Sequence, residues 1–169
     1  MRNCSWVPGV FENLAATGFD IVADCTSDRT RGRPSGYNCI AWAAGRTGEW
    51  WWPCGIGGYT WPVAEGTHIE PPNKETLDNF IAAFRSIGYL SSDNGNWEDG
   101  FEKVALYVNN QGIPTHAARS LPDGNWTSKL GEAEDIRHPT PESIGGRVYG
   151  KPVAFLKREI PGHKRKRYR

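Results

Sequence analysis

The chain has 169 residues, enough for one domain with a buried core that needs neither disulfides nor metals. Its 20 basic and 19 acidic residues leave a net charge of +1, which argues against a dedicated nucleic-acid-binding protein. No apolar run is long enough to span a membrane, and residues 1–6 lack the apolar core of a secretory signal. We therefore expect no nucleic-acid or membrane partner. The expected location is the cytoplasm, or export as an effector without a signal peptide.

The cysteines do not form a metal or redox motif. Cys4, Cys25, Cys39 and Cys54 include no C-x-x-C pair, so neither a metal site nor a cofactor is expected. Without a signal peptide, free thiols are the expected state. We assign no chemical role to Cys4, Cys25 and Cys54.

The first part of the chain is expected to hold one short strand and one short helix. Alternation over residues 19–23 predicts the strand, and the polar residues 26–36 predict a loop. Three alanines favour a helix from Cys39 to Ala44, with Gly45 as its end. Because this segment carries no charge, we expect the helix to be buried on every side.

A second helix is the strongest local prediction, between an aromatic loop over residues 50–62 and a polar loop over residues 91–100. The apolar residues at helical spacing are Leu77, Phe80, Ile81, Phe84 and Ile87. They predict a helix over residues 74–87, with Asn73 as its cap and Gly88 as its stop.

The remainder of the chain is expected to alternate strands and turns. The pattern predicts strands over residues 102–108, 115–121, 126–130, 135–138 and 151–157. The tight-turn residues 122–125 predict a hairpin between the second and third of these strands, and residues 141–144 predict one helical turn. The expected fold is α+β, with amino-terminal helices packed on an antiparallel β-meander. Residues 1–162 would form this single domain, and residues 163–169 a basic, disordered tail.

Cys39 and His116 are the candidate chemical pair. A cysteine nucleophile needs an ionisable thiol, a base and a third group that orients the base. Cys39 stands where a loop becomes a helix, and a helix N-terminus favours negative charge. His116 begins a later strand, and papain-like folds assemble their sites in this order. The orienting group should come from the neighbouring strand, where Ser128 and Lys129 lie, or from the turn that precedes it.

Several segments resemble one uncharacterised bacterial family, a domain of unknown function. They are YNCIAWAAG at residues 37–45, WWP at 51–53, FEKVALY at 101–107, THAAR at 115–119 and WTSKLG at 126–131. The resemblance runs from about Asp20 to Arg158. More distantly, the order of Cys helix, His strand and next strand is similar to papain-like and NlpC-type cysteine peptidases, which implies a papain-like cysteine peptidase fold.

The papain-like resemblance also implies roles for the neighbouring residues. Papain-type enzymes carry an Asn on the strand after the histidine, and the matching place here holds Ser128, which would orient the imidazole. The backbone N–H of Cys39 and the side chain of Asn38 would form the oxyanion hole. A Gln six residues before the nucleophile is replaced by Arg33. The resemblance implies a hydrolase of amide bonds (a peptidase, amidase or deamidase) with a peptide or protein substrate.

Two other readings stay open at this stage: an inactive papain-like binding module, and a toxin or effector domain of the same fold. Trp51, Trp52, Trp126 and Lys129 are candidates for a substrate groove, although the Trp-rich segment could instead pack over the Cys39 helix, or bind glycans. His68 and His138 lie in polar stretches and are expected at the surface. The sequence does not specify the oligomeric state.

Overall fold

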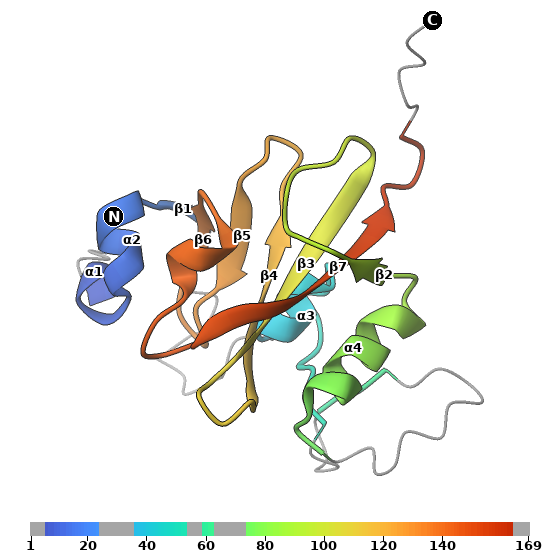
Figure 1. The fold of residues 1–169 in the computed structure, drawn as a ribbon. Coiled ribbons are helices and arrows are strands. Elements are labelled where there is room, and N and C mark those ends of the chain that lie inside the picture. Colours follow the sequence, from blue (N-terminus) through green and yellow to red (C-terminus); the bar gives the residue numbers. More distant parts are fainter. Residues whose placement is uncertain (1–5, 24–35, 54–58, 63–73, 164–169) are drawn as a thin grey trace, which may run out of the picture.

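The computed structural model describes residues 6–23, 36–53, 59–62 and 74–163, and the fold is given for these residues (Figure 1). Within them lie four α-helices, one 3-10 turn and a single seven-stranded antiparallel sheet, which confirms the α+β class. The helical elements are α1 (Trp6–Val10), α2 (Glu12–Thr17), α3 (Cys39–Ala43), α4 (Leu77–Ser86) and the 3-10 turn η1 (Pro141–Ile144). The strands are β1 (Asp20–Ala23), β2 (Leu90–Ser92), β3 (Phe101–Val108), β4 (Pro114–Ser120), β5 (Trp126–Lys129), β6 (Asp135–His138) and β7 (Lys151–Glu159).

The strand order of the sheet is β1-β6-β5-β4-β3-β7-β2. The run from β3 to β6 is the expected meander, and the turn between β4 and β5 is the expected hairpin. The last strand, β7, returns to pair with β3 along almost its whole length, from Phe101–Glu159 to Val108–Lys151. The two edge positions are taken by β1 and β2, which both precede the meander in the chain. The sheet therefore consists of the expected meander, β3 to β6, extended by β1 on one side and by β7 and β2 on the other.

Two apolar clusters cover the two faces of this sheet. Successive residues of a strand point to opposite faces, and β3 shows this directly. Val104 and Leu106 belong to the cluster that contains α3 and α4, which we call the α3 face. Ala105 and Tyr107 belong to the cluster that contains residues of α1, α2 and η1, which we call the α1 face. The sheet thus separates two layers of helix, as the ribbon shows for α1 and α2 on one side and α4 on the other (Figure 1).

The helix boundaries follow their caps. α3 begins at Cys39 as predicted, and Gly45 follows it with a φ of +76°, a value that glycine adopts without strain. α4 begins three residues later than predicted, because Thr76 is its cap. The Thr76 hydroxyl accepts a hydrogen bond from the Asn79 N–H at 3.3 Å, which satisfies one of the free amides of the first turn. The predicted cap, Asn73, lies outside the described residues.

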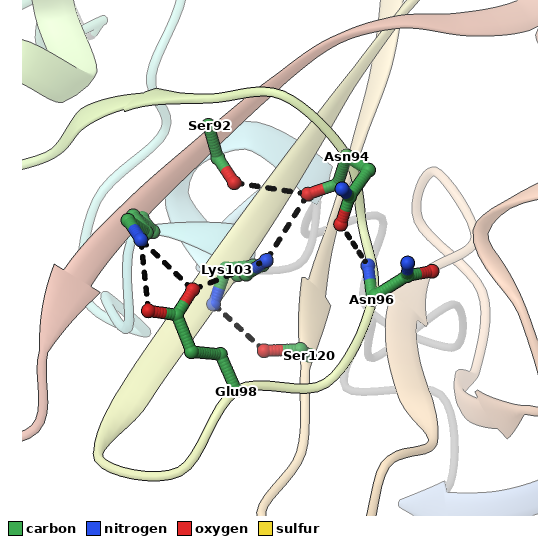
Figure 2. A network of polar contacts seen from close by, with 7 residues as sticks. Ser92, Asn94, Asn96, Glu98, Lys103 and Ser120 are labelled. Carbon is green, nitrogen blue, oxygen red and sulfur yellow. Dashed lines mark hydrogen bonds and ion pairs between the residues drawn. The ribbon is translucent and has the colours of Figure 1, made fainter.

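The loop after α4 is partly a strand. Residues 90–92 form β2, which pairs with β7, so the predicted loop begins later than expected. The rest of the loop is tied to β3 through Lys103, which is almost fully buried (Figure 2). Its ammonium donates to the Asn94 carbonyl at 3.2 Å and lies 3.5 Å from a Glu98 carboxylate oxygen, which also pairs with Lys157. These contacts hold the loop against the sheet.

In the described part of the chain, no helix is long and apolar enough to cross a membrane. Residues 164–169 of the predicted tail, the residues Arg33 and His68, and the three other cysteines lie outside the described residues, so the predictions made for them stay predictions.

Candidate functional site

Asn38 fixes the beginning of α3. Its side-chain oxygen accepts hydrogen bonds from the backbone N–H groups of Ala41 at 3.1 Å and Trp51 at 3.2 Å. Its side-chain nitrogen donates to the Trp51 carbonyl at 2.7 Å. Asn38 is therefore both a helix cap and a clamp on the Trp51 backbone. The sequence predicts an oxyanion-hole role for this side chain, but these bonds occupy its oxygen and one of the two N–H groups of its nitrogen.

Cys39 stands at the first position of α3, at the wall of a pocket. Its side chain is 7% exposed. Burial raises the pKa of the Cys39 thiol to about 11, although the backbone amides of Ala117, Ile40 and Cys39 itself and the charge of Lys129 act in the opposite direction. The thiol is therefore protonated near neutral pH and needs a base to become a nucleophile.

The pocket beside Cys39 has a volume of about 420 Å³, and none of the described residues that line it is charged. The residues that line it are Asn38, Cys39, Trp50, Trp52, Tyr59, Thr115, Gly131 and Tyr149. Trp52 is held in place because its indole N–H donates to a Glu75 carboxylate oxygen at 2.8 Å. Trp50 and Tyr59 meet edge to face, with ring centroids 6.3 Å apart. An uncharged, aromatic wall of this kind suits an apolar or ring-shaped group.

Three of the four groove candidates do not line this pocket. Trp51 and Trp126 belong to the clusters of the α3 face and the α1 face, and Lys129 is fully buried, so these three residues lie away from the pocket beside Cys39; Trp126 lines a different pocket. Trp51 turns inward because Asn38 clamps its backbone and Thr60 forms an isolated bridge with it. Only Trp52 keeps a place at the pocket.

His116 is fully buried, and its ring is held on three sides. Its Nε2 lies 2.9 Å from the Ser128 hydroxyl oxygen, the contact that we expected from the papain-like order. The ring stacks on Tyr149, with centroids 4.0 Å apart and planes 13° apart, and meets Tyr107 edge to face at 5.3 Å. Its other nitrogen, Nδ1, has no hydrogen-bond partner in the described part of the chain.

The Ser128 hydroxyl joins His116 to a second buried histidine. The Ser128 oxygen lies 2.9 Å from Nε2 of His138, and Nδ1 of His138 lies 2.8 Å from the Thr140 carbonyl oxygen. His138 is 1% exposed, so its prediction as a surface residue was wrong. A signal for its burial exists in the sequence: His138 is two positions from Ile136 on a strand, so both side chains lie on the same, covered face.

Burial disfavours the charged form of both histidines. Burial lowers the pKa of His138 to about 4, against a contribution from the Thr140 carbonyl that raises it. Burial, followed by the proximity of His138, lowers the pKa of His116 well below 6.5. Both imidazoles are therefore neutral at pH 7.

The thiol of Cys39 and the ring of His116 share neighbours without being bonded to each other. The backbone amide of Ala117, the residue after His116, acts to lower the pKa of the Cys39 thiol, and Tyr149 both lines the pocket beside Cys39 and stacks on His116. Ala117 belongs to the α3 face, whereas the His116 ring packs against Tyr107 on the α1 face. Among the described residues, no hydrogen bond joins Cys39 and His116, because Nε2 of the ring bonds Ser128 and Nδ1 has no partner.

A family model matches residues 26–157 of the chain. The chain belongs to the family described as a domain of unknown function (DUF7689). Neither the curated proteins nor the solved structures that were compared with it give a match. Because the match spans Cys39, His116, Ser128 and His138, the whole candidate site lies within the DUF7689 domain.

A buried charged cluster of the DUF7689 domain lies behind Cys39, on the α3 face. The Lys129 ammonium donates to the Ala133 carbonyl, lies 3.5 Å from an Asp135 carboxylate oxygen and sits 5.0 Å from the centre of the Tyr37 ring. The Tyr37 hydroxyl donates to the other Asp135 oxygen at 2.5 Å. Lys129 is thus a structural cation with its own counter-ion, and its charge favours the thiolate form of Cys39.

Proposed function

We propose that this DUF7689 domain is a thiol hydrolase of the papain-like class that acts on an amide-type bond. Cys39 is the nucleophile, His116 the base and Ser128 the residue that orients the base. The observation that carries the proposal is the state of the His116 ring. It is buried and neutral, its Nε2 is held by Ser128, and its Nδ1 is left without a partner. A general base needs such a ring, with one nitrogen fixed and the other available.

In the proposed reaction, the thiol proton of Cys39 moves to Nδ1 of His116 as the sulfur attacks the carbonyl carbon. The backbone N–H groups of Cys39 and Ile40, which act to lower the pKa of the Cys39 thiol, stabilise the negative oxygen that forms. His116 then gives the proton to the leaving amine, and a thioester to Cys39 remains. Water, with His116 again as base, hydrolyses the thioester and restores the thiol.

The raised pKa of Cys39 fits a mechanism in which proton transfer accompanies attack. With a pKa of about 11, only about one thiol in ten thousand is ionised at pH 7. A resting ion pair of thiolate and imidazolium is therefore disfavoured, and in the proposed reaction the neutral imidazole takes the proton during attack. The thiol must also approach Nδ1, because Cys39 belongs to the α3 face, the His116 ring packs against Tyr107 of the α1 face, and no hydrogen bond joins the two side chains. The proposed reaction therefore requires a rearrangement of the site when substrate binds.

The pocket indicates which part of a substrate lies beside the carbonyl. Among the described residues its wall contains no charged side chain, and Trp50, Trp52, Tyr59 and Tyr149 give it an aromatic surface. We therefore infer that the acyl side of the substrate carries an uncharged apolar or aromatic group. A carboxylate or an ammonium there would lose its hydration without gaining a partner of opposite charge.

A second candidate is a binding module of the same fold without catalysis. The observation that favours it is the missing hydrogen bond between Cys39 and His116. In this reading the aromatic pocket binds an uncharged ligand, and Cys39 is one of its apolar wall residues.

The rate at which iodoacetamide alkylates Cys39 separates the two candidates. Peptide mapping by mass spectrometry isolates Cys39 from the other three cysteines, and Cys54→Ala is the control that should change nothing. A base-assisted thiol should react at a rate that stays flat from pH 6 to pH 9, since His116 is neutral across this range. His116→Gln should lower the rate at pH 7 at least tenfold and make it rise about tenfold per pH unit, as expected of an unassisted thiol.

Hydrolysis itself is tested with the p-nitrophenyl ester of an N-acyl phenylalanine. The hydrolase should release a burst of nitrophenolate equal to the amount of enzyme, because the acyl group stays on Cys39. Cys39→Ala should abolish the burst. Wild-type alkylation that already rises tenfold per pH unit, together with no burst, would establish the binding module instead.

A further inference from the structure

The chain from Thr140 to His116 consists of groups whose hydrogen-bonding roles can be worked out in order. The Thr140 carbonyl can only accept a hydrogen bond, and it lies 2.8 Å from Nδ1 of His138. Nδ1 of His138 therefore carries a proton. Since the ring is neutral at pH 7, its Nε2 carries none and must accept.

The Ser128 hydroxyl has one proton, and the bare Nε2 of His138 at 2.9 Å needs a donor. Ser128 therefore donates to His138. Its oxygen can then only accept from Nε2 of His116, which lies 2.9 Å away, so Nε2 of His116 carries the proton of that neutral ring. The remaining nitrogen, Nδ1 of His116, is left with a bare lone pair.

The opposite assignment of donors and acceptors along this chain is disfavoured at the Thr140 carbonyl. If His116 carried its proton on Nδ1, its Nε2 would be an acceptor and Ser128 would have to donate to it. His138 would then have to supply Nε2–H, which in a neutral ring leaves a bare Nδ1 facing the Thr140 carbonyl. Two acceptors at that distance leave both buried groups without a hydrogen bond, which costs the full desolvation of each group. All three side chains are fully or almost fully buried, so little water is available to relieve that cost.

We propose that Thr140, His138 and Ser128 form a relay that fixes the tautomer of His116, with its proton on Nε2 and a free lone pair on Nδ1. His138 is then a positioning residue: it acts on His116 through Ser128. The catalytic consequence rests on the proposed function, since only a bare Nδ1 can take the thiol proton of Cys39. The tautomer itself does not rest on it.

Nitrogen-15 NMR of the imidazoles tests the relay directly, because protonated and bare ring nitrogens have widely separated chemical shifts. The chain has four histidines. The double variant His68→Gln, His163→Gln leaves only His116 and His138, and serves as the reference protein. We expect both remaining rings to be neutral at pH 7, with the proton of His116 on Nε2 and the proton of His138 on Nδ1. A His116 ring protonated on Nδ1 in this reference protein would overturn the proposal.

Two substitutions at position 138 then test the direction of control. His138→Phe removes the acceptor for the Ser128 hydroxyl, so Ser128 should donate to His116 and move its proton to Nδ1. His138→Gln can still accept from Ser128 through its amide oxygen and should keep the proton on Nε2. Equal tautomers in the two variants would overturn the relay. If His138→Phe does not fold, Ser128→Ala should replace the single His116 tautomer by a mixture, and an unchanged Nε2–H signal there would contradict the relay equally.

The alkylation rate of Cys39 connects the relay to chemistry. The flat, base-assisted rate should be lost in His138→Phe and kept in His138→Gln. If the NMR result is as expected but no protein shows base-assisted alkylation, the proposed function fails while the tautomer relay stands. If His138→Phe moves the proton to Nδ1 and the base-assisted rate is unchanged, His138 has no positioning role in the chemistry.

Discussion

Acid should destabilise the fold through His138, and the size of the effect follows from its burial. In the unfolded chain this imidazole gains a proton as the pH falls through about 6.5, whereas in the folded protein its pKa is about 4. Between these values the unfolded state binds more protons, so stability that is fully present above pH 6.5 is lost as the pH falls. At about 1.4 kcal/mol per pKa unit, moving from pH 6.5 to pH 5 removes about 2 kcal/mol. His116, whose pKa burial also lowers, adds to the loss in the same direction.

Urea unfolding at pH 7 and pH 5 measures this loss, provided that the m-value is the same at both. In His138→Gln the difference between the two pH values should shrink by about 2 kcal/mol, because glutamine does not titrate. His163→Gln is the matched control, since that imidazole lies exposed at the surface beside Asp99, and it should leave the difference unchanged. Burial raises the pKa of Asp135, which works in the opposite sense, but it contributes equally to both proteins. If the wild type and His138→Gln lost the same free energy of unfolding, His138 would not be buried and neutral as described.

Two further predictions concern the helices on the α3 face. Thr76→Ala should lower the free energy of unfolding by about 1 kcal/mol, because the Asn79 amide loses its cap, and urea unfolding would contradict this with a loss below about 0.3 kcal/mol. Ile40→Ala should cost about 2–5 kcal/mol in the same assay, because the side chain is fully buried in α3. Val22→Ala, at a side chain that is 53% exposed, is its control and should change stability by no more than about 0.5 kcal/mol; equal losses in both variants would refute the packing argument.

The sequence predicts the local elements well because their signals are local. The strands from residue 101 to residue 138 alternate along the chain and are separated by recognisable turns, so their hairpin pairing follows. The positions of β1 and β2 at the two edges could not be derived in this way, because pairing β1 with β6 joins segments more than 100 residues apart. The alternation of apolar and polar residues predicts which side chains of a strand share a face, but it does not predict which distant strand pairs with that strand.

For the candidate site too, some residues could be predicted from the sequence and others could not. Cys39, His116 and Ser128 could be named from their order along the chain, and the structure brings His116 and Ser128 together. Among consecutive tryptophans no local signal shows which indole turns inward; the Asn38 clamp on the Trp51 backbone decides it. His138 was missed because the polar residues around it were given more weight than its alternation with Ile136, which places both side chains on the face that the α1 and α2 helices cover.

The sheet ends in short strands on both sides. β1 has four residues and an irregular register between Ile21 and Ala23, β2 has three residues, and the long strands β3 and β7 are interior. A strand from a second molecule would find few free backbone groups along β1, whereas on the other side β2 pairs with β7 only at residues 155–157 and leaves the rest of the outward side of β7 without a partner strand in the described sheet. Edge-to-edge joining of sheets is a common route to aggregation, and short, irregular edges oppose it. At high protein concentration β3, which is paired on both sides, should therefore stay out of intermolecular β-association, and the part of β7 before Phe155 is the place where such association would begin.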